Sequence, residues 1–143
     1  MHLIRIYFDG GCKPNPGQGY GSYEILPERL KYHQKNMLIQ FGFMTSNMAE
    51  YHSLISALKK LWHDSKNGAV LSLTESHPIC TSRITLDIFS DSKLLVQQMN
   101  GRWKCKVAHI VELMDEAHLI LKEFGHWKLT WNPREKNVAR FGH

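Results

Sequence analysis

The sequence predicts one mixed α/β domain in which helices flank a five-stranded sheet, built from a three-strand antiparallel meander and two parallel strands. Three strand-like segments follow one another over short connections within the first 43 residues, which is typical of antiparallel pairing. Helical and strand-like patterns then alternate as far as residue 131, which indicates parallel strands joined by helices. A chain of 143 residues can bury one core, so we expect a single domain over residues 1–143.

The three strands of the meander are predicted from alternating apolar and polar side chains. They cover residues 3–9, 20–26 and 37–43. In the first strand, Ile4 and Phe8 lie on the same side, and we expect that side to face the core.

Helical periodicity begins after the meander. Residues 47–64 are expected to form an amphipathic helix. The apolar face of this helix comprises Tyr51, Leu54, Ile55, Leu58, Leu61 and Trp62. A strand over 84–90, a short helix over 92–99, a longer helix with apolar positions from 110 to 124 and a last strand over 126–131 complete the predicted order.

Residues 66–82 show no clean period, and both a long loop and an extra hairpin are compatible with them. Three cysteines, Cys12, Cys80 and Cys105, are scattered without a CxxC pair, which argues against a disulfide framework or a zinc site and favours a reducing cytoplasm. No apolar run is long enough to cross a bilayer. The net charge of +5 fits a polyanionic partner.

Three acids stand at the ends of predicted elements, and each has a purely structural explanation. Asp9 is followed by glycine, as in many turns. Glu50 lies three residues after Asn47, the spacing of a capping box. Asp91 precedes Ser92 at the start of a helix and could be its N-cap.

Considered together, the three acids indicate a metal site. Asp9 and Asp91 end two apolar strands, and Glu50 begins the helix over the same sheet. If the two strands are neighbours, the carboxylates converge and need a cation to offset their repulsion. Oxygen ligands favour Mg²⁺ or Mn²⁺ over zinc, and carboxylates that hold two such ions are suited to phosphodiester hydrolysis.

Four segments resemble the type 1 ribonuclease H family. They are FDGGCKPNPG (8–17), SNMAEY (46–51), FSDSKLLVQQMNG (89–101) and WNPREKN (131–137). The resemblance spans nearly the whole chain, and it implies a ribonuclease H-like fold. It also implies endonucleolytic cleavage of the RNA strand of RNA–DNA hybrids with two metal ions, leaving 5′-phosphate and 3′-hydroxyl ends.

The resemblance places Asp9, Glu50 and Asp91 on the family's first three metal-binding carboxylates. Gly10 and Gly11 would let the backbone approach the nucleic acid closely. The matched positions that lie against the hybrid, where RNA 2′-hydroxyls are recognised, are Gly11, Cys12, Asn15, Ser46 and Asn47. For Cys12, burial beside the strand is an equally good explanation.

Two further segments are candidates for substrate contact. Trp103, Lys104 and Lys106 occupy the place where some members of the family carry a longer basic projection that holds the DNA strand. A core tryptophan with two solvated lysines is an equally good interpretation. Arg134 lies in a shortened loop over 132–135 and is expected to contact phosphate, although an ion pair with a nearby acid is the alternative.

The fourth carboxylate of the family has no counterpart here. The matching position falls on Phe141, or on Arg140 if the alignment moves by one residue. Three explanations stay open: His143 or Asn137 replaces the missing ligand, a segment beyond the sequence supplies it, or it is absent and Mn²⁺ is preferred. We favour the first, with His143 ahead of Asn137.

The leading functional hypothesis is therefore a monomeric, cytoplasmic, metal-dependent ribonuclease H whose partner is an RNA–DNA hybrid and which binds no membrane. The alternative is a non-catalytic module that retains the fold and binds hybrids or double-stranded RNA. A third possibility is another enzyme of the wider ribonuclease H-like group, although the glycine-rich loop makes this less favoured.

Overall fold

The structure is a computed structural model that describes all residues from 1 to 143. Its main sheet has five strands in the order β4-β2-β1-β6-β7. These strands are β1 (His2–Cys12), β2 (Gly17–Pro27), β4 (Gln34–Met44), β6 (Ile84–Ser90) and β7 (His126–Trp131). The β1–β2 and β2–β4 pairs are antiparallel, whereas β1–β6 and β6–β7 are parallel. The predicted fold class is therefore confirmed.

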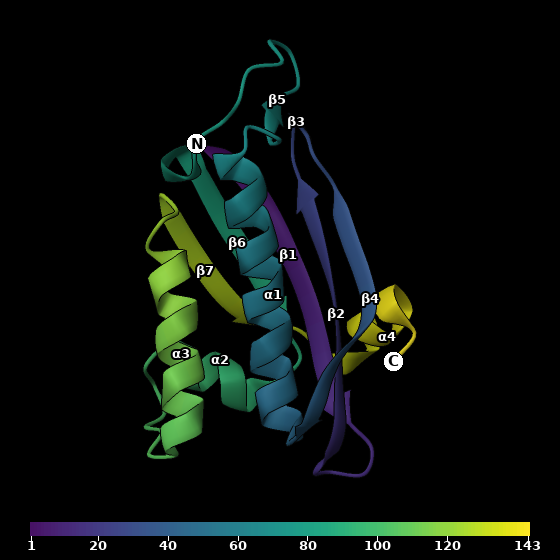
Figure 1. Ribbon diagram of the computed structural model, residues 1–143. Coiled ribbons are helices and arrows are strands. Elements are labelled where there is room, and N and C mark those ends of the chain that lie inside the picture. Colours follow the sequence, from purple (N-terminus) through teal and green to yellow (C-terminus); the bar gives the residue numbers. More distant parts are fainter.

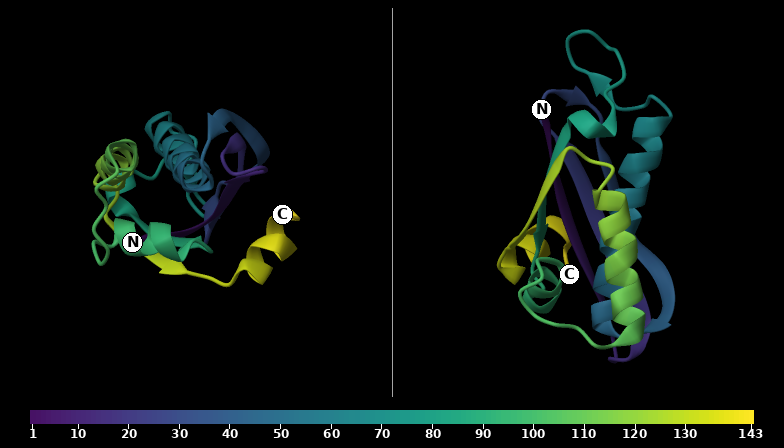
Figure 2. Two further views of the ribbon diagram at one scale, coloured as in Figure 1. Left: turned by 90° about the horizontal axis from the view of Figure 1, so that it is seen from below. Right: turned by 90° about the vertical axis from the view of Figure 1, so that its left-hand side faces the viewer.

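Four helices flank this sheet. They are α1 (Ser46–Lys66), α2 (Lys93–Met99), α3 (Ala108–Leu121) and α4 (Arg134–Phe141). The two long helices, α1 and α3, pack beside each other over one face, and α4 lies on the other side of the sheet (Figures 1 and 2). No helix is long and apolar enough to cross a membrane.

The core lies between the sheet and the α1–α3 layer. Ile4, Ile6 and Phe8 of β1 are completely buried, as the alternation predicted. The predicted apolar face of α1 is buried as well, except for Trp62, which packs at the margin of the core. Burial of these side chains is the main stabilising contribution in a domain of this size.

Gly10 allows α1 to approach the sheet closely. A Cβ atom at this position would lie 2.6 Å from the Ala49 carbonyl oxygen and 2.7 Å from Ser53 Oγ. Gly10 is paired across the β1–β2 ladder with Gly21, so the two glycines together leave room for the helix. The absence of a Cβ at Gly10 thus makes room for α1, and the approach of the Gly10 backbone to nucleic acid stays a prediction.

The segment over 66–82 is mostly irregular. Its only strand, β5 (Leu71–Ser72), pairs with β3 (Leu30–Lys31) in a two-stranded ribbon, and a 3-10 turn, η1 (Thr81–Arg83), leads into β6. Figure 1 shows this ribbon at the opposite end of the molecule from α2. Within the segment, Leu71 also bridges antiparallel to Pro78, so the segment contains a short hairpin-like turn in addition to its pairing with β3.

The helix α4 was not predicted from the sequence. It begins after Pro133 and ends at Gly142, whose φ of +77° turns the chain back. Asn137 is buried and donates to the Phe8 carbonyl at 3.4 Å. Arg140 forms an ion pair of 2.5 Å with Glu24 of β2. These contacts fix α4 against β1 and β2, next to the end of β1.

Candidate active site

A cavity of about 390 Å³ opens beside the residues that end β1 and β6. The residues around it come from β1, β2, α1, α4 and the connections between them. They are Asp9, Gly10, Gly11, Cys12, Lys13, Tyr20, Ser46, Glu50, Asp91, Ser92, Arg134 and His143. Three acids, two cations and one histidine thus share one polar cavity.

Asp9 lies in β1 opposite Ser22 of β2. Its Oδ1 accepts a hydrogen bond of 3.0 Å from the Gly10 amide. Burial, together with the nearby charge of Asp91, raises the pKa of Asp9 to about 7. A carboxyl with this pKa holds a proton for part of the time at neutral pH.

Glu50 projects from α1, and the structure excludes its capping-box interpretation. The N-cap of α1 is Thr45, whose side chain accepts from the Met48 amide, and the first turn contains no acid. Glu50 therefore lies beyond that turn and faces the cavity instead. Burial raises its pKa to about 8; a hydrogen bond with Ser92 opposes this shift, whereas Asp91 and Asp9 add to it.

Asp91 follows β6 directly, and it is not the N-cap of α2. Ser92 is that cap, because its side chain accepts from the Leu95 amide at 3.2 Å. The carbonyl of Asp91 accepts a hydrogen bond of 3.1 Å from the Trp131 indole. The connection after β6 is thus held from both sides, while the Asp91 side chain lines the cavity.

His143 reaches the cavity because the chain reverses at Gly142. Its Nδ1 lies 3.1 Å from Asp9 Oδ2, and its Nε2 lies 2.7 Å from Ser22 Oγ. Burial lowers the pKa of His143, which favours the neutral ring with one N–H. The Leu38 amide already donates a hydrogen bond to Ser22 Oγ. We therefore assign the Ser22 hydroxyl as the donor to Nε2 of His143. The ring proton is then on Nδ1, which donates to Asp9.

Asn137, the other candidate for the fourth ligand, does not reach the cavity, and neither do the two residues at the position of the family's fourth carboxylate. Asn137 is 1% exposed and its amide faces the Phe8 carbonyl. Arg140 pairs with Glu24 and lies over the Tyr7 ring, with the guanidinium carbon 3.6 Å from the ring centroid. Phe141 is buried. The structure therefore places His143 at the site and Asn137 in the contact between α4 and β1.

Arg134 begins α4 and lines the cavity. Its charge lowers the pKa of Asp9, Glu50 and His143 as a secondary effect. The alternative that Arg134 pairs with a nearby acid is not seen, since no ion pair of the structure includes it. The predicted loop over 132–135 is thus largely the first turn of α4.

Four predicted contact residues form one cluster next to the cavity. Cys12 is buried, and its Sγ lies 3.5 Å from Asn15 Oδ1 and 3.4 Å from Ser46 Oγ. Asn15 Oδ1 also accepts from the Ser46 amide at 3.1 Å. Asn47 follows, and its buried Oδ1 has no hydrogen-bond partner. The glycine-rich loop and the start of α1 are thereby joined into one surface.

Trp103, Lys104 and Lys106 lie between α2 and α3, outside the cavity. The interpretation of Trp103 as a core side chain is wrong, because it is 45% exposed. Both lysines are exposed too.

Sequence reasoning missed Tyr20 and Ser22 of β2. Tyr20 lines the cavity with its ring edge toward His143, at a centroid distance of 5.2 Å, and Ser22 holds the same imidazole. Tyr20 and Ser22 are two residues apart in β2 and lie on the same face of the sheet as Asp9, but only the strand register reveals this. No sequence motif distinguishes them from other strand residues.

The donor set of the cavity fits a hard divalent cation. Three carboxylates surround the space, and desolvated acids that repel one another take up protons unless a cation neutralises them. The raised pKa values of Asp9 and Glu50 are evidence of this condition. No three ligand side chains are already drawn together around a single point, so binding of an ion would need them to move closer.

Comparisons with known proteins agree with this geometry. A model of the "Reverse transcriptase-like" family matches residues 82–140. The bifunctional protein Rv2228c of Mycobacterium tuberculosis is 31% identical over 136 residues, which cover 94% of this chain and 32% of that protein. Ribonuclease HI of Campylobacter jejuni is 33% identical over 100 residues, or 70% of this chain and 53% of that protein. The chain thus spans about a third of the length of the mycobacterial relatives it matches.

Two solved structures share the fold. The N-terminal RNase H domain of Rv2228c aligns with a TM-score of 0.72 at 27% identity, covering 97% of this chain and 88% of that one. LC11-RNase H1, solved in complex with an RNA/DNA hybrid, aligns with a TM-score of 0.72 at 28% identity, covering 95% and 89%.

The sheet order, the flanking helices and these similarities define a protein of the ribonuclease H fold. Within that class, the chain is similar to the type 1 ribonucleases H, and these similarities support the family indicated by its motifs.

Proposed function

We propose that this chain is a metal-dependent endonuclease that hydrolyses the RNA strand of RNA–DNA hybrids. The observation that carries the proposal is the meeting of Asp9, Glu50 and Asp91, from three different elements, around one cavity. A relative solved with an RNA/DNA hybrid supports the choice of substrate.

The three carboxylates are proposed to hold two ions of Mg²⁺ or Mn²⁺. When bound, these ions would activate water and stabilise the leaving oxygen, giving 5′-phosphate and 3′-hydroxyl ends. Asp9 and Glu50 must lose their protons first, so binding of the ions competes with protonation. His143 donates from Nδ1 to Asp9 and thereby orients that carboxylate, and it is the candidate for a fourth ligand if the ring turns.

Lys13 and Arg134 are the two cations of the cavity. Either one can attract the phosphate that is to be cleaved, and Arg134 can also offer two parallel hydrogen bonds to its oxygens. Both side chains are exposed, so they remain accessible to a nucleic acid from outside.

Selection of RNA over DNA is assigned to the cluster of Cys12, Asn15, Ser46 and Asn47, with the backbone of Gly11. This surface offers hydroxyl, amide and thiol groups next to the cavity. The Asn15 amide and the Ser46 hydroxyl, which are not fully buried, can form hydrogen bonds with a ribose 2′-hydroxyl, a group that DNA lacks. Trp103, Lys104 and Lys106 are proposed to contact the opposite strand.

The proposal is tested by incubating labelled RNA–DNA hybrid, duplex RNA and duplex DNA with the protein, in Mg²⁺ and separately in Mn²⁺. We expect cleavage of the hybrid alone. The Asp91→Asn variant should lose at least about 100-fold of the rate, since even residues that only support a metal ligand contribute 10- to 100-fold. The exposed Asp115→Asn change on α3 is the matched control and should have no effect.

Retained cleavage by Asp91→Asn would refute the metal-site assignment. Absence of cleavage with either ion, together with salt-sensitive binding of the hybrid, would instead identify a binding module that has kept the fold. The observation that favours this second function is the lack of a fourth carboxylate: of the two matching positions, Phe141 is buried and Arg140 pairs with Glu24.

A further inference from the structure

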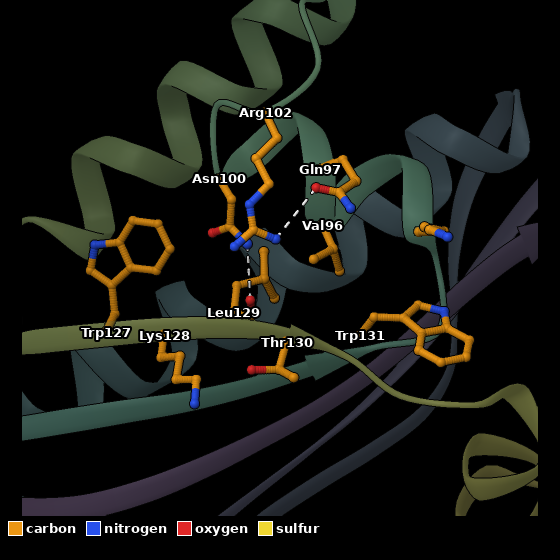
Figure 3. A pocket seen from close by; sticks show the side chains of 10 residues that line it. Val96, Gln97, Asn100, Arg102, Trp127, Lys128, Leu129, Thr130 and Trp131 are labelled. Atoms are coloured by element: carbon orange, nitrogen blue, oxygen red, sulfur yellow. Dashed lines mark hydrogen bonds between the residues drawn. The ribbon is translucent and has the colours of Figure 1, made fainter.

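The largest cavity of the molecule, about 600 Å³, is separate from the candidate active site. It lies between α2, the turn that follows α2, and β7, and we call it the α2–β7 groove. Figure 3 shows Arg102 extending from the turn after α2 toward β7 and bonded to Gln97 of α2, with Trp127 near one end of the strand and Trp131 near the other. No residue that lines the candidate active site also lines this groove. The two are linked by the hydrogen bond from the Trp131 indole to the Asp91 carbonyl.

The lining of the groove is positively charged. Lys93, Arg102 and Lys128 contribute three cations, and no Asp or Glu lines the groove. All three side chains are exposed, and none of them takes part in an ion pair. Such a surface attracts an anionic partner.

Two indoles accompany these cations. Trp131 is 48% exposed, which is unusual for so large an apolar side chain, and Trp127 is partly buried. They are four residues apart on β7, so about 13 Å separates them at about 3.3 Å per residue. That length accommodates more than one stacked base, and stacking on aromatic rings tolerates any base.

The groove adjoins the candidate active site. The Trp131 indole donates to the Asp91 carbonyl, and Lys93 follows Asp91 by two residues on the same connection. A strand that passes the acids can therefore continue over Trp131 and Lys93 into the groove.

The edge of the sheet itself is poorly suited to a peptide. β7 is the outer strand of the sheet, and an extended peptide would need its successive free amides and carbonyls. The Leu129 carbonyl, in the middle of that edge, already accepts a hydrogen bond of 3.0 Å from Asn100 of α2. Addition of a strand would break this contact, whereas bases on the indoles would not.

We propose that the α2–β7 groove binds a single-stranded segment of nucleic acid that continues from the cleavage site. The bases stack on Trp127 and Trp131, and the phosphates face Lys93 and Arg102; Lys128 extends on the other side of β7, where it can meet a phosphate that passes the edge of the strand. This inference rests on the proposed function for the direction of the strand, because it treats the groove as an extension of the hybrid-binding surface.

The test measures binding of a fluorescently labelled oligo(dT) strand by anisotropy in EDTA, where no metal-dependent contact can form. The double variant Arg102→Gln/Lys128→Gln should raise Kd at least about 5-fold and lower the salt slope of log Kd by about 1.4, or about 0.7 for each cation removed. Trp127→Leu should raise Kd to a similar extent. Circular dichroism and thermal unfolding establish that each variant folds.

The matched control is Lys31→Gln/Lys59→Gln, which removes the same charge from the far ribbon and from α1. Its salt slope should be unchanged. Equal behaviour of the groove variant and this control would overturn the proposal. The proposal would be overturned as well if the groove variant lost the binding of polyglutamate shown by the unmodified protein but bound oligo(dT) as tightly as that protein. This result would identify an acidic peptide as the partner.

Hybrids complete the test. A single-stranded overhang should tighten hybrid binding by the unmodified protein and should not tighten binding by Arg102→Gln/Lys128→Gln. If the protein cleaves hybrids but the groove variant binds the single strand as tightly as the unmodified protein, the role of the groove is overturned and the proposed activity stands. If the groove variant binds the strand more weakly but the unmodified protein does not cleave hybrids, the proposed activity is overturned and the role of the groove stands.

Discussion

Glu50 lies on a helix and Asp9 on a strand, and burial raises the pKa of both carboxyl groups. Their pKa values in the folded protein, about 8 and about 7, lie above the values near 4 expected in the unfolded chain. Between these limits the folded state binds more protons than the unfolded state. The free energy of unfolding therefore falls as pH rises from about 4 through about 8.

This sign leads to a prediction for the metal-free protein. In EDTA, the Tm should fall as pH rises from about 5 to about 8, and Glu50→Gln should flatten the upper part of this curve. At about pH 8 the variant should be more stable by roughly 4 °C, the shift that about 1 kcal/mol produces in a domain of this size. Differential scanning calorimetry measures both effects.

Glu112→Gln, at an exposed position of α3, is the control and should follow the unmodified curve. If Glu50→Gln also follows that curve in parallel, the carboxyl of Glu50 is ionised in the folded state and the prediction fails.

His143 gives a second prediction at the scale of one residue. Because its Nδ1–H orients Asp9, His143→Ala should weaken Mn²⁺ binding by about 10-fold, as expected for loss of a group that orients a ligand. Isothermal titration calorimetry measures this affinity. His77→Ala, at the far end of the molecule, should leave it unchanged, and equal affinities for the two variants would remove His143 from the site.

At the scale of elements, the strands and α1 could be predicted because each has a long, regular pattern of apolar residues. The meeting of three acids followed from two strand ends and one helix start. The helix α4 could not be predicted, because only Val138 and Phe141 are apolar at helical spacing. Contacts of Asn137 and Arg140 with β1 and β2 stabilise it, and these depend on the folded sheet.

The two interpretations of Asn137, as a metal ligand and as a structural contact of α4, can be separated by mutation. Its buried amide donates to the Phe8 carbonyl next to Asp9, so Asn137→Ala should lower the free energy of unfolding by about 1–3 kcal/mol. Urea unfolding measures this, and the exposed Lys136→Ala serves as the control. Unchanged stability combined with weaker Mn²⁺ binding would return Asn137 to the metal ligands.

The α1–β1 contact gives a prediction about two neighbouring glycines. Gly10→Ala should destabilise the fold by about 1–3 kcal/mol, because its Cβ would overlap the Ala49 carbonyl. At Gly11 the nearest atom to an added Cβ is the Tyr20 hydroxyl oxygen, at 3.1 Å, and this ring end can move. Gly11→Ala should therefore cost less in urea unfolding, and the reverse order would contradict the proposed packing.

At the scale of the whole molecule, the net charge of +5 becomes meaningful through its distribution. Cations line the cavity, the α2–β7 groove and the exposed connection before α3. The sequence shows the excess of charge but not this arrangement, because Arg102 and Lys128 come to the same groove only through the packing of α2 against β7.

The connection before α3 can be tested independently of the groove. Lys104→Gln/Lys106→Gln should weaken hybrid binding at all sequences and lower the salt slope by about 1 for each lysine. Binding is measured in Ca²⁺ or EDTA over a series of salt concentrations. An unchanged slope would mean that both lysines are only solvated surface residues.

The pairing of Arg140 with Glu24 has an evolutionary consequence. Arg140 is one of the two positions that can match the family's fourth carboxylate, and its replacement by aspartate would set that acid against Glu24 and remove the cation from the Tyr7 ring. Like charges in a partly buried contact destabilise a fold. An acid at position 140 therefore requires a change of Glu24 as well, and positions 24 and 140 are expected to vary together among relatives of this chain.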